Sequence, residues 1–172
     1  EEIAELLTRM REEKWVRLYG LDFGSNFYNG YLAHDPRDDI WYAYAEYFFS
    51  SDTDKFLREH GEHLKAKDPI GFHARIPIYG DPSARQAMKD LEAVGLFCSP
   101  ANNDVYAGIN YVKSLLQLRH VQGRLLPRLR VFHSCTRLRL ELSELYMHGL
   151  TKDGEVAPDV IVMKNDHACD AL

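Results

Sequence analysis

The clearest pattern along the chain is a set of apolar runs rich in β-branched and aromatic residues. Residues 15–22, 30–34 and 40–49 form three such runs, and the polar segment 35–39 joins the last two. Runs of this kind, separated by Gly, Pro, Asn and Asp, are typical of strands and their turns. The pattern predicts a three-stranded meander.

Residues 1–14 have the spacing of an amphipathic helix instead. Ile3, Leu6, Leu7 and Met10 recur at intervals of three and four residues among charged side chains. This spacing gives one apolar stripe, which either packs on the domain or links it to a preceding one.

The rest of the chain is predicted to alternate between helices and short strands. Helices are expected at 51–67, from Asp81 and Pro82 onward, at 104–119, at 135–148 and at the terminus, and strands at 76–80, 95–98, 129–132 and 160–164. This order predicts an α/β fold with a mixed sheet. Glu46, on the third strand of the meander, could face a site or solvent, and we expect solvent.

Asp22 ends the first strand between Gly20 and Gly24. An aspartate at the end of a core strand is costly unless it is paired, hydrogen-bonded or bound to a cation. It could simply satisfy turn amides. Asp81, however, also follows an apolar run, although it could be only a helix cap. The strand at 160–164 again leads into acidic residues, and carboxylates that converge through the fold require a compensating cation such as Mg²⁺ or Mn²⁺.

The terminal segment offers several possible ligands. If Asn165 caps a helix, Asp170 shares a face with both Asp166 and His167. Asp170 is therefore the preferred ligand, whereas Asp166 could serve only as an anion at the helix N-terminus. His167 could bind Mn²⁺ or position a water, or it could be a partly exposed helix histidine.

Length and composition indicate one soluble, intracellular domain. The 172 residues are 45% hydrophobic, with no apolar run long enough for a membrane span and no secretory signal. Cys98, Cys135 and Cys169 lack Cys-x-x-Cys spacing, so neither a disulfide framework nor a thiolate zinc site is expected.

Charge is unevenly distributed along the chain. The net charge is −5, yet residues 105–140 contain seven Lys and Arg and no Asp or Glu. A segment of one sign favours a polyanionic partner over an ordinary solvated face. The leading candidates for phosphate contacts are Lys113, Arg124, Arg128 and Arg130.

Five segments together resemble the ribonuclease H-like nucleases, and within them the C-terminal nuclease domain of the large terminase subunit of tailed double-stranded DNA phages. These segments are residues 19–24, 79–84, 108–113, 135–146 and 165–172. The resemblance implies a ribonuclease H-like mixed central β-sheet flanked by α-helices. It also implies that Asp22 and Asp81 are the first two metal-binding acids and that Asp170 or Asp166 is the third.

The activity that this resemblance implies is hydrolysis of double-stranded DNA by two divalent ions, Mg²⁺ or Mn²⁺, with Asp22 bridging them. In the family, this cut separates a packaged genome from its concatemer. Such proteins also carry an ATPase motor, but no phosphate-binding Gly-Lys-Ser/Thr loop occurs here. We therefore expect residues 1–14 to be a linker from a missing ATPase domain and residues 15–172 to be the nuclease domain.

The same resemblance implies further partners, namely the portal and the small terminase subunit. It places the protein in the cytoplasm of the infected host cell and transiently at the procapsid portal, with no role for a membrane.

Three other functions compete with this interpretation. Residues 22–26 also resemble the first phosphate loop of actin-like nucleotide binders, but those folds need a second such loop and about twice this length. A non-catalytic nucleic-acid scaffold would explain the basic segment alone. A resolvase or transposase would keep the chemistry and change the substrate.

Overall fold

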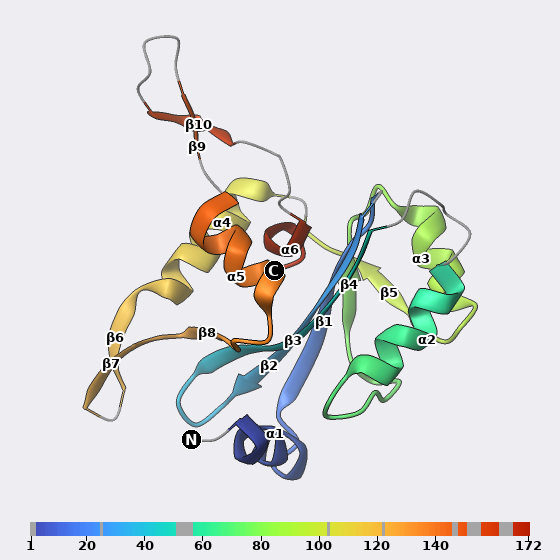
Figure 1. Cartoon of the computed structure of the whole chain (residues 1–172), viewed down its shortest axis with the longest axis horizontal. Helices are drawn as coiled ribbons and strands as arrows, with labels where there is room; N and C mark the ends of the chain where they lie inside the picture. The colour runs from blue at the N-terminus through green and yellow to red at the C-terminus, as the bar shows by residue number, and fades with distance from the viewer. Residues whose placement is uncertain are drawn as a thin grey trace.

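The computed structural model describes residues 3–24, 26–50, 57–102, 104–121, 123–145, 148–150, 156–161 and 167–172. Its centre is a six-stranded mixed sheet with the order β5-β4-β1-β2-β3-β8 (Figure 1). These strands are β1 Val16–Asp22, β2 Asn26–Asp35, β3 Ile40–Ser50, β4 Ile78–Gly80, β5 Cys98–Pro100 and β8 Leu129–Val131. β1, β2 and β3 pair antiparallel, as the meander requires, and β4, β5 and β8 run parallel to their neighbours. The predicted α/β class with a mixed sheet is confirmed.

Helices cover both faces of this sheet (Figure 1). They are α1 Ile3–Glu12, α2 Leu57–Lys67, α3 Arg85–Glu92, α4 Val105–Leu116, α5 Thr136–Leu140 and α6 His167–Asp170. α2 and α3 lie against one face, and α5 and α6 lie against the other, where α6 contacts β1 and β2. None of the helices described here is long and apolar enough to cross a membrane.

The helix α1 packs on this domain. Its Leu6 and Met10 are buried in the same core as the central strands. The apolar stripe predicted from the sequence is therefore used within the domain.

A buried polar cluster lies between the sheet and the segment that follows α2. Asp68 pairs with Arg17 at 2.9 Å and accepts the hydroxyl protons of Tyr19 at 2.5 Å and Tyr44 at 3.2 Å. The backbone N–H of Ile70 donates to the same carboxylate at 2.9 Å. Because a buried carboxylate is costly without such partners, this cluster ties the segment after α2 to β1 and β3.

Two helix predictions in the second half of the chain were wrong. The helix predicted at 135–148 is α5 followed by a π-helical turn, Glu141–Leu145, and residues 148–150 form strand β9. β9 pairs antiparallel with β10, Val156–Ile161, so tertiary pairing replaces the last helical turn. The helix predicted to open at Asp81 and Pro82 begins instead at Arg85. The predicted hairpin turn within 151–155 lies outside the described residues.

Smaller differences surround α4. This helix ends at Leu116, before a hairpin of β6 Leu118–Val121 and β7 Arg124–Pro127 that the sequence did not predict. Leu116 was expected to be buried but is 41% exposed. The strand expected at 95–98 starts at Cys98.

Candidate active site

One cleft of about 580 Å³ lies between β1, the end of β4, α4 and α6. The acids Asp22, Asp81, Asp104 and Asp170 line this cleft, together with Lys113. The rest of its wall is mainly apolar. The structure thus brings together three acids that were predicted from segments far apart in the sequence.

The strands explain why Asp22 and Asp81 lie at the same end of the sheet. Asp22 is the last residue of β1, and Asp81 follows directly after β4. β1 and β4 are parallel and pair Leu21 with Gly80. Because side chains alternate along a strand, Leu18, Gly20 and Asp22 share one face of β1, and all three line the cleft.

Asp81 is held in a local turn. Its carboxylate accepts the backbone N–H of Ser83 at 2.8 Å and the Ser83 hydroxyl at 2.7 Å. Aspartate often forms such turns with the residue two positions on, and this turn delays the start of α3. Asp81 is therefore not the cap of that helix, a possibility that the sequence had left open.

The terminal helix α6 rests directly on β1. A Cβ atom added to Gly20 would come within 1.7 Å of the Ala171 carbonyl oxygen. Only glycine permits this approach, which sets the helix beside the strand that ends at Asp22. Asp170 lies one residue earlier and lines the cleft. Asp166 lies outside the described residues, and of His167 only its place at the start of α6 is described.

Glu141 is a buried residue that the sequence analysis did not identify. Its side chain is fully buried, and one carboxylate oxygen accepts the backbone N–H groups of Ala168 at 2.6 Å and Cys169 at 3.0 Å. Arg137 Nε donates to the other oxygen. Burial raises the pKa of Glu141, whereas the Cys169 N–H, the Arg137 side chain and the Ala168 N–H act in the opposite direction. The Arg137-Glu141 spacing of four residues was the only local signal.

Glu46 does not face solvent, so that expectation was wrong. Its carboxylate accepts the backbone N–H groups of Arg137 at 2.8 Å and Leu138 at 3.0 Å, and the hydroxyl of Tyr28 at 3.2 Å. Backbone N–H groups in the first turn of a helix have no partner within it. Glu46 supplies that partner and joins α5 to β3.

The cleft carries the kind of donors that hard divalent cations prefer. Carboxylate oxygens from β1, from the turn after β4 and from α6 suit Mg²⁺ or Mn²⁺. Among the described residues, however, no three His, Cys, Asp or Glu side chains lie close enough together to hold a metal ion. The donor types fit such a site, and Asp166 and the His167 side chain lie outside what the structure describes.

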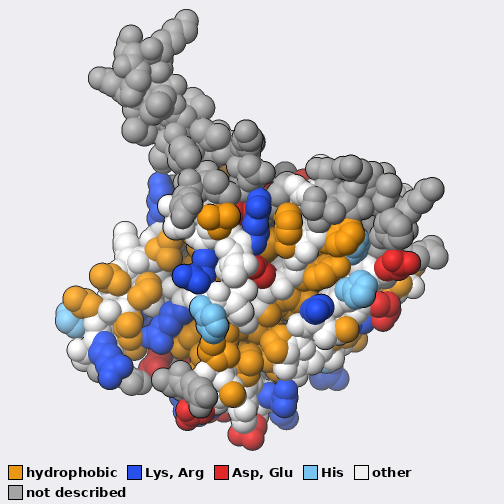
Figure 2. Space-filling view, viewed as in Figure 1, with side chains coloured by type: hydrophobic (Ala, Val, Ile, Leu, Met, Phe, Trp, Pro, Cys, Tyr) orange, Lys and Arg blue, Asp and Glu red, His pale blue; other side chains and the backbone are white. Residues whose placement is uncertain are grey.

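The four predicted phosphate-binding cations have different surroundings. Lys113 lines the cleft on α4, and Arg124 is exposed on β7. Arg130 lies over the Tyr42 ring at 5.6 Å. On the face shown in Figure 2, Lys and Arg side chains are spread over the part formed by α4, α5 and the β6-β7 hairpin.

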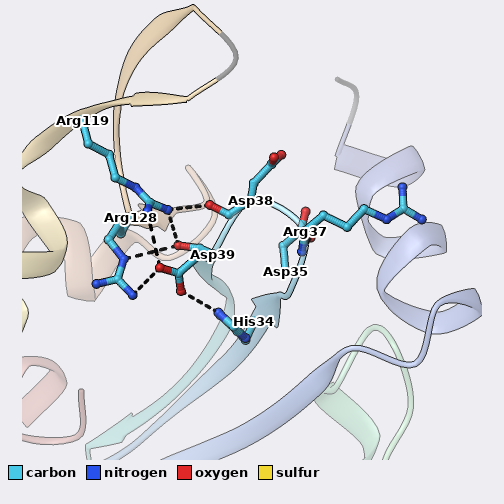
Figure 3. Close-up of polar contacts among 7 residues, drawn as sticks. All are labelled: His34, Asp35, Arg37, Asp38, Asp39, Arg119 and Arg128. Atoms are coloured by element: carbon cyan, nitrogen blue, oxygen red, sulfur yellow. Dashed lines mark hydrogen bonds and ion pairs between the residues drawn. The ribbon is translucent and has the colours of Figure 1, made fainter.

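Arg128 belongs to an ion-pair cluster around the turn between β2 and β3 (Figure 3). Its guanidinium lies 2.6 Å from the carboxylate of Asp39, which also pairs with Arg119 at 3.4 Å and His34 at 3.0 Å. The hydrogen bonds from Arg128 and then His34 lower the pKa of Asp39 to about 2. Two of the seven cations in the acid-free segment are thus engaged with this acidic turn.

Comparison with solved structures identifies the fold. The full-length large terminase of a thermophilic bacteriophage matches with a TM-score of 0.70 at 23% identity, over 91% of this chain and 38% of that chain. The nuclease domain of the large terminase g2p of bacteriophage SPP1, solved with bound Mn, matches with a TM-score of 0.67 at 16% identity, over 90% of this chain and 81% of that one. The P22 large terminase nuclease domain matches with a TM-score of 0.66 at 20% identity, over 91% and 77%.

The chain therefore has the ribonuclease H-like fold of large terminase nuclease domains, as its sequence motifs predicted. It spans 38% of the length of the full-length thermophilic-phage terminase. No family model matches the sequence, and no curated protein matches it.

Proposed function

We propose that this chain is the nuclease domain of a phage large terminase and cuts double-stranded DNA in a metal-dependent reaction during viral genome packaging. One observation carries the proposal. Asp22, Asp81 and Asp170 line the same cleft in a fold shared with terminase nuclease domains. Fold alone does not imply function, so the argument depends on this shared cleft.

Asp22, Asp81 and Asp170 would hold two divalent ions, Mg²⁺ or Mn²⁺, with Asp166 or His167 completing the ligands. The SPP1 nuclease domain was solved with Mn, and that of phage G20c with cobalt. When bound, such ions lower the pKa of a water and stabilise the leaving oxygen of the phosphodiester.

The residues of the chain supply position and charge. Asp22 is held by a strand that pairs on both sides, with β2 and with β4, so its backbone is rigidly placed. Lys113 and Arg124 are the proposed direct contacts to phosphates. Arg128 and Arg130 remain candidates whose guanidinium groups are shared with the cluster around Asp39 and with the Tyr42 ring.

The larger assembly is also a proposal. Because this chain spans little more than a third of the full-length thermophilic-phage terminase, we propose that an ATPase domain precedes it, joined through residues 1–14, and that residues 15–172 form the nuclease unit. The structure of that terminase with ATP-γ-S supports a nucleotide-binding part in proteins of this kind. Portal and small terminase subunit would be the partners, in the host cytoplasm and at the procapsid.

Plasmid cleavage tests the proposal. Supercoiled plasmid is incubated with the chain in Mn²⁺, in Mg²⁺ and with EDTA, alongside Asp22→Asn and the control Asp90→Asn on α3. We expect cleavage only with a divalent ion, a loss of more than ~100-fold for Asp22→Asn, and normal activity for the control. Plasmid binding without cleavage in either ion would favour the non-catalytic scaffold and overturn the proposed function.

A further inference from the structure

The helix α6 is too short to be stable by itself. It has four residues, and isolated helices of fewer than about 12 residues are marginal in water. Its place in the fold must therefore come from contacts with other elements. Two of these contacts are unusually specific and lie on either side of Asp170.

The first contact is with Glu141. Its buried carboxylate accepts the N–H groups of Ala168 and Cys169, which fixes the helix one and two residues before Asp170. The second contact is the approach of the Ala171 carbonyl to Gly20, one residue after Asp170. Asp170 is therefore placed on the cleft by a carboxylate on one side and by strand β1 on the other.

Glu141 is itself held from the sheet. Arg137, one turn earlier, donates to the carboxylate and lies over the Phe48 ring at 4.9 Å. Glu46 on β3 caps the helix that carries Arg137. Glu141 also opens a π-helical turn, an irregularity that is frequent at functional sites.

We propose that Glu141 is a positioning residue that fixes the register of α6, so that Asp170 is presented to the cleft. This inference rests on the proposed function in so far as Asp170 is a metal ligand. A buried carboxylate contributes little net stability compared with an apolar side chain of the same size, but it can specify one arrangement among several. Fixing the orientation of a ligand is a use that would retain such a residue.

Two substitutions separate reach from charge. Glu141→Gln keeps an oxygen that can accept both N–H groups, whereas Glu141→Asp keeps the charge but withdraws it by one methylene. Asp68→Asn is the matched control, because the Asp68 side chain is also fully buried and hydrogen-bonded but lies on the opposite face of the sheet. Each protein is compared under conditions where it is folded.

The measurements are amide hydrogen exchange at Ala168 and Cys169 and Mn²⁺ affinity by calorimetry. We expect Glu141→Asp to lose protection at both amides and to bind Mn²⁺ roughly 10- to 100-fold more weakly, while Glu141→Gln stays within about 3-fold of the wild type. Asp68→Asn should retain wild-type protection at these amides and wild-type Mn²⁺ affinity. In cleavage assays, Glu141→Asp should lower kcat and leave the KM for DNA unchanged.

Wild-type protection and Mn²⁺ affinity in Glu141→Asp would overturn the inference, as would a loss in Glu141→Gln equal to that in Glu141→Asp. If the wild type binds no Mn²⁺, the proposed function fails, and the exchange measurement still decides whether Glu141 fixes α6.

Discussion

The two faces of the central sheet use aspartate differently. On the face covered by α2, Asp68 is buried among Arg17, two tyrosine hydroxyls and a backbone N–H. On the face covered by α6, Asp22, Asp81 and Asp170 line a cleft. A carboxylate enclosed by its own donors stabilises the fold, whereas carboxylates gathered on a cleft are placed to bind something from outside.

The largest effect on stability is expected for Asp68→Asn. This change leaves the Arg17 guanidinium buried without its ion-pair partner, and breaking a buried pair costs about 3–5 kcal/mol. Urea denaturation should show this loss, with Asp90→Asn on α3 within ~0.5 kcal/mol of the wild type. A loss below about 1 kcal/mol would remove the contrast between the two faces.

A smaller loss is expected for Gly20→Ala, which acts on the cleft face. The new Cβ would meet the Ala171 carbonyl oxygen at 1.7 Å, so α6 must shift, at a cost of about 1–3 kcal/mol. Mn²⁺ affinity should fall with it. Gly30→Ala is the control, because its Cβ would lie an ordinary 3.5 Å from the Tyr28 ring. Equal Mn²⁺ affinities in both variants would show that α6 does not depend on this contact.

The basic surface can be divided by salt dependence. Neutralising Lys113 and Arg124 together with Gln should reduce the slope of log Kd against log salt for DNA by about 1.8, because each phosphate contact contributes ~0.9. The pair Arg128→Gln and Arg130→Gln should change the slope less, since these groups are engaged with Asp39 and Tyr42. A larger change for the second pair would reverse this assignment.

The smallest effect concerns the turn in Figure 3 at acid pH. Arg128 and then His34 hold the pKa of Asp39 at about 2, below its ordinary value of 3.8. A lowered pKa means that the tie is present above pH 3.8 and is lost as the pH falls toward 2. Hydrogen exchange in β6 and β7 should rise across this window, and Asp39→Asn should remove the dependence. An identical rise in that variant would assign it to another group.

The sequence predicted the meander and its acids because the signals are local. The apolar residues of β1 continue to Asp22, and Asp81 follows the next apolar run, so parallel pairing of β1 and β4 brings the two acids together. The sequence did not predict the role of Glu141. Its partners are backbone N–H groups 27 and 28 residues further along, and no side-chain pattern marks such contacts.

The same reason explains the errors around α5 and α4. Residues 148–150 belong to a strand only because β10 pairs with them. Glu46 was assigned to solvent because its partners, the first N–H groups of α5, are 91 and 92 residues away. Local propensity is overridden where a distant segment supplies the hydrogen bonds.

The most direct test of the contrast between the faces is the change in the free energy of unfolding caused by Mn²⁺. Binding to the folded state alone stabilises a protein by about 2.7 kcal/mol at roughly 100 times the Kd. We predict this gain for the wild type and for Asp68→Asn, from its lower starting stability, and no gain for Asp22→Asn. An equal gain in Asp22→Asn and in the wild type would contradict the account, because the ion would then bind elsewhere than the cleft.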